Sequence, residues 1–161
     1  MGNLDDVINE LGIPELTRKP RNSGGKRSDS DEFYVIGLCN EALGKEAIQQ
    51  HKFPFLLGDS GRELPVDAFY PDLNLVVEFY ERQHTEEVSF FNRRMTVSGV
   101  SRGEQRKIYD ERRRTELPKH GIKVVVISYS DFGVSKKLLR KHDADLSIIK
   151  TILANNGLKT L

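Results

Sequence analysis

The alternation of apolar and polar positions divides this chain into a polar N-terminal part and a longer part rich in regular elements. Apolar residues recur at helical intervals over 3–12 and predict a short helix that ends at Gly12. Residues 13–30 are mostly polar, with Pro, Gly, Ser and charge, which is typical of a linker or arm. We therefore predict that residues 1–30 are peripheral and that residues 31–161 form the folded domain.

A first core helix is expected to begin at Ser30 or Asp31, either of which can cap it, and to end at Gly44. Cys39 falls among apolar residues, so a buried thiol is the expected state. The apolar face of this helix is predicted to use Phe33, Ile36, Leu38 and Leu43.

Three antiparallel strands are predicted to follow, after a short helical turn at 45–50. The apolar run Phe53–Leu57, the turn sequence GDSG and the alternating stretch Leu64–Tyr70 indicate a β-hairpin. A second tight turn at Pro71–Asn74 leads to the β-rich run Leu75–Phe79.

The second half contains a polar helix and one strongly apolar strand. After an irregular stretch at 84–100, residues 103–119 favour a helix with few apolar positions, which exposes much surface to water or to a polyanion. The β-branched run Lys123–Ile127 is typical of an interior strand, so we expect it at the sheet centre.

Two helices are predicted to close the chain. Asp131 is expected to cap a basic helix at Val134–Lys141, and Asp143 or Asp145 a last helix through Leu153. The predicted fold class is α/β, with the order α-β-β-β-α-β-α-α.

Composition narrows the function classes. The 161 residues carry a formal net charge of +1, so any polyanion site must be local, as at the basic stretches Arg18–Arg27 and Arg106–Lys119. One cysteine excludes an internal disulfide and a Cys-rich zinc module. No apolar run approaches the length of a membrane span, so we expect a cytoplasmic chain.

Two carboxylates interrupt apolar strands and are the main candidates for chemistry. Asp67 stands in LPVDAF and Glu78 in LVVEF, and a tight turn between these strands would bring the two side chains close together. Such carboxylates need a compensating charge, and a pair of oxygen ligands suits Mg²⁺ or Mn²⁺. The alternatives are a solvated sheet face or pairing with arginines such as Arg113.

The surrounding residues extend this pair into a longer pattern. In VDAFYPDLNLVVEFYERQH, ten residues separate Asp67 from Glu78, and His84 follows. Asp110, Arg113, Leu117 and Gly121 then precede the strand KVVVI. The stretch from Leu64 to Phe132 resembles the core of the PD-(D/E)XK nucleases, especially the branch that resembles very-short-patch-repair endonucleases.

This resemblance implies a restriction-endonuclease-like fold, with a central mixed β-sheet of about four strands flanked by helices. It implies a Mg²⁺- or Mn²⁺-dependent DNA endonuclease of restriction or repair, with Asp67 and Glu78 as catalytic metal ligands. No organic cofactor is expected. A single small domain would cut one strand, so double-strand cleavage would need a homodimer or a partner subunit.

The sequence departs from the family pattern after Glu78. The family usually has a lysine two residues after the glutamate, and here that residue is Tyr80. Gln83 is a candidate to orient the attacking water, and Arg82 to act as a charge partner that contacts nucleic acid. His84 is a candidate general base or metal neighbour, with an exposed polar residue as the alternative.

Further candidates lie on the two long helices. Glu32 is a candidate acidic member of the site, ranked ahead of Glu41, although a first-turn carboxylate also stabilises a helix dipole. Arg106, Lys107 and Arg113 are candidate DNA contacts, and a salt bridge to Asp110 or Glu116 is the alternative for Arg113.

Two other function classes remain open. The chain is alternatively a catalytically inactive nuclease-like module that binds nucleic acid or a protein, which the loss of the lysine at Tyr80 would suit. The charged helix at 103–119 could also bind a protein partner.

Overall fold

The computed structural model describes residues 30–81, 101–134 and 137–161. Residues Asp31–Leu161 form one compact unit, to which the following description applies. The predicted N-terminal helix and linker, the stretch 84–100, and Arg82, Gln83 and His84 lie outside the described residues. The division into an arm and a domain therefore stays a prediction.

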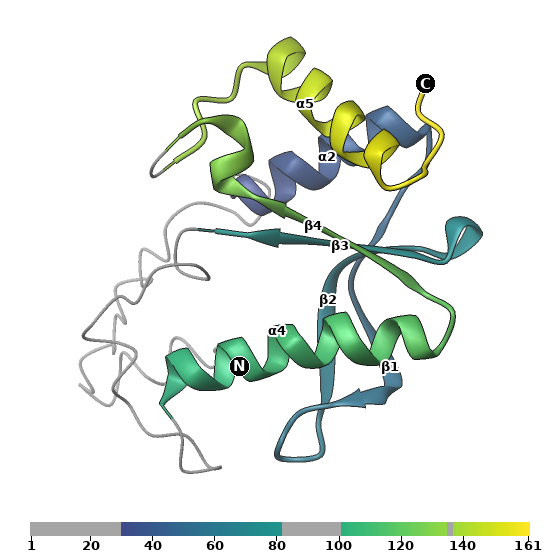
Figure 1. Cartoon of the computed structure of the whole chain (residues 1–161), viewed down its shortest axis with the longest axis vertical. Helices are drawn as coiled ribbons and strands as arrows, with labels where there is room; N and C mark the ends of the chain where they lie inside the picture. The colour runs from purple at the N-terminus through teal and green to yellow at the C-terminus, as the bar shows by residue number, and fades with distance from the viewer. Residues whose placement is uncertain (1–29, 82–100, 135–136) are drawn as a thin grey trace, which may run out of the picture. The chain divides into compact units, whose positions relative to one another are not determined.

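A four-stranded mixed sheet forms the centre of this unit, in the order β1-β2-β3-β4 (Figure 1). The hairpin of β1 (Ile48–Leu57) and β2 (Glu63–Tyr70) continues antiparallel into β3 (Leu75–Tyr80). β4 (Lys123–Ser128) pairs in parallel with β3. The predicted α/β class and the three antiparallel strands are confirmed.

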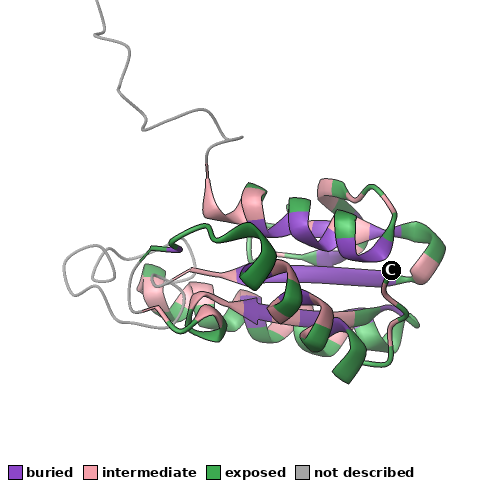
Figure 2. Cartoon of the chain, turned by 90° about the horizontal axis from the view of Figure 1, so that it is seen from above, coloured by how far each residue is buried: buried purple, intermediate pink, exposed green. Residues whose placement is uncertain are grey.

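Helices cover both faces of the sheet. α2 (Asp31–Leu43) and α5 (His142–Asn155) pack together on one face, and α4 (Arg102–Lys119) lies on the other (Figure 1). Figure 2 shows that the buried residues gather in the sheet and on the helix faces turned toward it. None of the helices in the described part of the chain has both the length and the apolar character of a membrane span.

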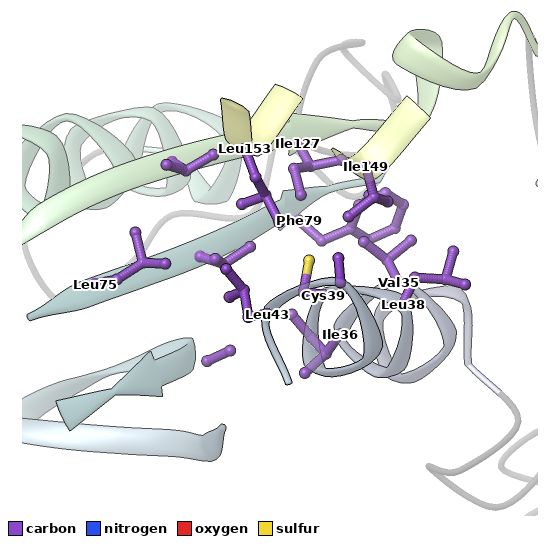
Figure 3. Close-up of a cluster of buried hydrophobic side chains, with 14 of the residues drawn as sticks. Val35, Ile36, Leu38, Cys39, Leu43, Leu75, Phe79, Ile127, Ile149 and Leu153 are labelled. Atoms are coloured by element: carbon purple, nitrogen blue, oxygen red, sulfur yellow. The ribbon is translucent and has the colours of Figure 1, made fainter. Parts of the chain in front are cut away.

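The apolar core has two parts because β3 is buried on both faces. The larger part joins α2 and α5 to alternate β3 residues, with Cys39, Phe79 and Ile149 at its centre (Figure 3). Burial raises the pKa of the Cys39 thiol to about 12, as expected for a packed rather than reactive cysteine. The smaller part packs Val76 of β3 against Leu117 of α4. β3 therefore carries residues into both layers, and Glu78 lies on the α4 side.

The first helix agrees with the prediction in its limits but not in one apolar position. α2 spans Asp31–Leu43, and Gly44 follows with a positive φ of 65°. Phe33 is exposed, so its place on the core face was wrong. The buried positions are instead Val35, Ile36, Leu38, Cys39, Ala42 and Leu43.

Two predictions about the sheet were wrong. The helical turn expected at 45–50 does not form, because Ile48 and Gln49 pair with Phe69 and Ala68 as the start of β1. β4 lies at the sheet edge, not at the centre. Its apolar run is explained by helices packed on both of its faces, which bury side chains in an edge strand as well as in a central one.

The basic helix expected at 134–141 is absent from its described residues. A 3-10 helix, η3 (Tyr129–Phe132), takes its place in the predicted order of elements, and Asp131 closes a capping box with Ser128. The Leu138 amide donates to the Asp31 carboxylate instead of a helical carbonyl. Arg140 also binds Asp31 and has a positive φ of 54°.

The last helix begins at His142, before both predicted caps. Lys141 is its N-cap, and Asp143 and Asp145 lie in its first turn, where carboxylates favour the positive end of the helix dipole.

Candidate metal and nucleic-acid site

Asp67 and Glu78 face each other where the ladder between β2 and β3 ends. The last pair of that ladder is Ala68 with Val77, and the same register sets Asp67 opposite Glu78 one step further. At that point, the hydrogen bonds between the two strands run from main-chain amides to these carboxylate side chains. The Phe79 amide donates to Asp67 Oδ2 at 2.8 Å, and the Asp67 amide donates to Glu78 Oε2 at 3.2 Å. These bonds fix both carboxylates at one place.

Glu78 is the more buried member of the pair, with 4% of its surface exposed. Burial raises its pKa well above the usual range, and the neighbouring Asp67 charge raises it further, while Arg113 opposes the shift. Glu78 Oε1 is buried and has no hydrogen-bond partner among the described residues. Its compensating charge among the described residues comes from an ion pair with Arg113.

Arg113 of α4 contacts the buried member of the pair, Glu78. Its Nε lies 3.4 Å from Glu78 Oε1 and donates to the Pro65 carbonyl at 3.1 Å. Its Nη1 donates to Asp110 at 3.1 Å, so the predicted alternative, a salt bridge to Asp110, is present. Only 16% of the Arg113 side chain is exposed. A phosphate contact by Arg113 stays a prediction.

The donor set of this pair fits a hard divalent cation. Glu78 Oε1, which has an ion pair but no hydrogen bond among the described residues, and the adjacent Asp67 carboxylate could supply two oxygen ligands. Mg²⁺ commonly takes one or two carboxylates and completes its shell with water and phosphate. Across the described ranges, no group of three or more His, Cys, Asp or Glu residues is arranged to hold a metal.

Glu32 contacts β1 through Gln50, a residue that sequence reasoning missed, and its membership of the site stays a prediction. Gln50 Nε2 donates to Glu32 Oε1 at 2.9 Å. The register of β1 and β2 sets Gln50 opposite Asp67, and Gln50 has a positive φ of 53°, which is strained for a non-glycine residue within a strand. Glu41 instead pairs with His142 of α5 at 2.8 Å, where both side chains are half exposed.

Tyr80 lies two residues beyond Glu78 on β3, and Arg114 of α4 contacts it. Arg114 Nη1 donates to the Tyr80 hydroxyl at 3.1 Å. Partial burial and the charge of Asp110 raise the pKa of Tyr80 to about 12, so its phenol is neutral at ordinary pH. Arg114 was not predicted, because the sequence shows three adjacent arginines and does not reveal which one faces β3.

Several positive charges of α4 form ion pairs with carboxylates of the same chain. Arg112 binds Asp59 of the β1–β2 hairpin, and Lys119 binds Glu116. The predicted DNA contacts Arg106 and Lys107 lie in the first half of the helix, half-buried and exposed respectively. A uniform basic face along α4 is thus not present.

Comparisons with known proteins add little beyond this geometry. No protein-family model matches the sequence, and no curated protein shows significant similarity to it. Among solved structures, the chain is similar to "The 5-Hydroxymethylcytosine-Specific Restriction Enzyme AbaSI", with 16% identity and a TM-score of 0.40. The match covers 95% of this chain and 45% of that chain, so this chain spans less than half of that protein. A TM-score this low assigns neither a family nor a substrate.

Proposed function

We propose that this chain is a metal-dependent nuclease domain that hydrolyses phosphodiester bonds in DNA, with Asp67 and Glu78 as the ligands of Mg²⁺ or Mn²⁺. One observation carries the proposal. Two carboxylates meet at the end of the β2–β3 ladder, and the buried Glu78 Oε1 has no hydrogen-bond partner among the described residues. A divalent cation would satisfy that oxygen and remove the repulsion between the two carboxylates.

Bound there, the cation would stabilise negative charge on the phosphoryl group and promote ionisation of water. In the hydrolysis, a water oxygen bonds to phosphorus, the bond from phosphorus to one sugar oxygen breaks, and that oxygen leaves with a proton. Gln83 is proposed to orient the water, and His84 to accept its proton as a general base. Arg82, Arg106 and Lys107 are proposed to contact the DNA backbone.

A second candidate function is an inactive nuclease-like module that binds DNA or a protein. The resemblance expects a lysine where this chain has Tyr80. Arg113 also lies beside Glu78 and compensates part of its charge without any metal. Both features would suit a domain that has kept the nuclease-like fold and lost catalytic activity.

A cleavage assay separates the two candidates. Purified protein is incubated with supercoiled plasmid and with single-stranded, duplex and branched DNA, in Mg²⁺, Mn²⁺ or EDTA. We expect metal-dependent cleavage that is lost in Asp67→Asn and Glu78→Gln and kept in Asp72→Asn. Asp72 is a suitable control because its carboxylate is exposed and pairs only with the surface residue Lys45 among the interactions described. DNA binding without cleavage would favour the inactive module.

A further inference from the structure

Three consecutive arginines on α4 have three different sets of partners. Arg112 donates to the Leu57 carbonyl at 2.7 Å and pairs with Asp59, which ties α4 to the β1–β2 hairpin. Arg113 lies against the buried Glu78 and Asp110. Arg114 contacts Tyr80 and pairs with Glu111 at 2.7 Å. Because their partners differ, the three cations are not equivalent toward a polyanion.

Arg114 is the arginine best able to exchange its partner for a phosphate. Its side chain is 42% exposed, and that of Glu111 is 63% exposed. Exposed ion pairs one helical turn apart contribute little stability, so a phosphate can replace Glu111 at low cost. The planar guanidinium binds two phosphate oxygens at once. Arg113 is too enclosed for this exchange.

Tyr80 connects the Arg114 guanidinium to the strand that carries Glu78. It stands two residues after Glu78 on β3, so both side chains leave the strand on the same face. The half-buried ring therefore anchors a hydrogen bond that holds an otherwise surface arginine against β3, two residues beyond Glu78.

We propose that Arg114 binds a backbone phosphate of DNA next to Asp67 and Glu78, and that Tyr80 is the positioning residue that orients its guanidinium. Glu111 gives up its ion pair when the phosphate binds. This inference rests on the proposed function, since it assigns a substrate contact to the same site.

The test is the salt dependence of DNA binding, measured by fluorescence anisotropy in Ca²⁺ with the DNA form that wild type binds best. Each lost phosphate contact lowers the slope of log affinity against log salt by about 1. We expect this loss in Arg114→Gln and a retained slope in Arg114→Lys. Lys119→Gln is the matched control, because Lys119 also lies on α4 in an exposed pair with a carboxylate three residues away.

Tyr80→Phe tests the positioning role. It should weaken binding less than Arg114→Gln does, and Arg114→Gln should have a smaller effect in the Tyr80→Phe background than in wild type. Thermal unfolding of each variant, followed by circular dichroism, should match wild type.

Each outcome decides the inference separately from the proposed nuclease function. An unchanged slope in Arg114→Gln, an equal loss in Lys119→Gln, or no DNA binding by wild type would overturn the Arg114 contact. If the slope falls as expected and no DNA is cleaved in any metal, the phosphate contact stands and the nuclease proposal fails. If cleavage depends on metal and Asp67 while Arg114→Gln changes nothing, only the contact fails.

Discussion

At the scale of single residues, the decisive feature is a carboxylate that the fold does not satisfy by itself. Glu78 is almost fully buried, and its raised pKa has burial and Asp67 as its main causes. Arg113 offsets only part of this cost, because it is shared with Asp110 and with the Pro65 carbonyl. Buried charges that are not fully compensated are concentrated at functional sites.

The stability of the metal-free protein should therefore depend on the ionisation of Glu78. Since the pKa of Glu78 is raised in the folded state, its contribution to stability is full below the unfolded pKa and is lost as pH rises through the folded pKa. We expect the free energy of unfolding of wild type, relative to Glu78→Gln, to fall as pH rises from below the usual glutamate pKa through the raised pKa of folded Glu78. Urea denaturation in EDTA measures this difference. A difference that stays constant with pH, or rises, would show that Glu78 is not destabilised by ionisation.

Gln50 offers a second test at this scale, because substitutions can separate the effect of its strained backbone from the effect of its side chain. With φ at 53°, Gln50→Gly should be more stable than Gln50→Ala by about 1 kcal/mol. The neighbouring Gln49 has no positive φ and pairs regularly with Ala68, so the order of stability should reverse there. Chemical denaturation of the four variants checks this, and the same order at both positions would contradict the strain.

The sequence revealed the two carboxylates but not the residues around them. Asp67 and Glu78 stand out because each interrupts an apolar strand. Gln50 and Arg114 carry no such signal, since a positive φ and a contact between α4 and β3 depend on the folded chain. Arg82, Gln83 and His84 lie outside the described residues, so their roles stay predictions.

At the scale of elements, α4 is the helix that completes the site, although it buries few of its own residues. Among its 18 residues, only Asp110 and Leu117 are buried. Tyr109 accepts a hydrogen bond from the Asp59 amide, and Arg112 and Arg113 bind the strands below. α4 is therefore attached by a small apolar contact and by several polar ones.

Leu117 should account for much of the apolar attachment of α4. We expect Leu117→Ala to lower the free energy of unfolding by about 2–5 kcal/mol, because it leaves a cavity in the smaller core. Ile108→Ala on the same helix should cost much less, since Ile108 is 40% exposed. Equal losses in urea denaturation would mean that α4 is not anchored through Leu117.

Elements were predictable where local pattern and tertiary packing agree. The β1–β2 hairpin, β3 and α4 follow from alternation, turn residues and helix-forming composition. The stretch 134–141 has a helical composition, yet the Asp31 carboxylate binds the Leu138 amide and Arg140. A contact across more than 100 residues of chain cannot be inferred from that stretch alone.

At the scale of the whole folded unit, the two faces of the sheet are covered by different helices and have different roles. The face under α2 and α5 holds the larger apolar core, and the face under α4 holds Glu78 and its arginine (Figure 1). β3 connects them, because its alternate residues enter both layers. The candidate site is thus built on the most buried strand, where a carboxylate is held rigidly and at the highest cost.

The position of β4 illustrates what sequence cannot supply at this scale. Its apolar run correctly predicts a strand buried by helices, because Val125 and Ile127 are buried. Whether such a strand is central or at an edge depends on whether another strand pairs with its free side. Here β3 alone pairs with β4 in the described sheet.

The central claim is that Asp67 and Glu78 bind a divalent cation, and titration of Mn²⁺ followed by isothermal calorimetry tests it most directly. We predict binding by wild type and Asp72→Asn, an affinity that increases with pH as Glu78 loses its proton, and a loss of more than about tenfold in Asp67→Asn and Glu78→Gln. Absence of Mn²⁺ binding by wild type, or equal binding by all four proteins, would contradict the account.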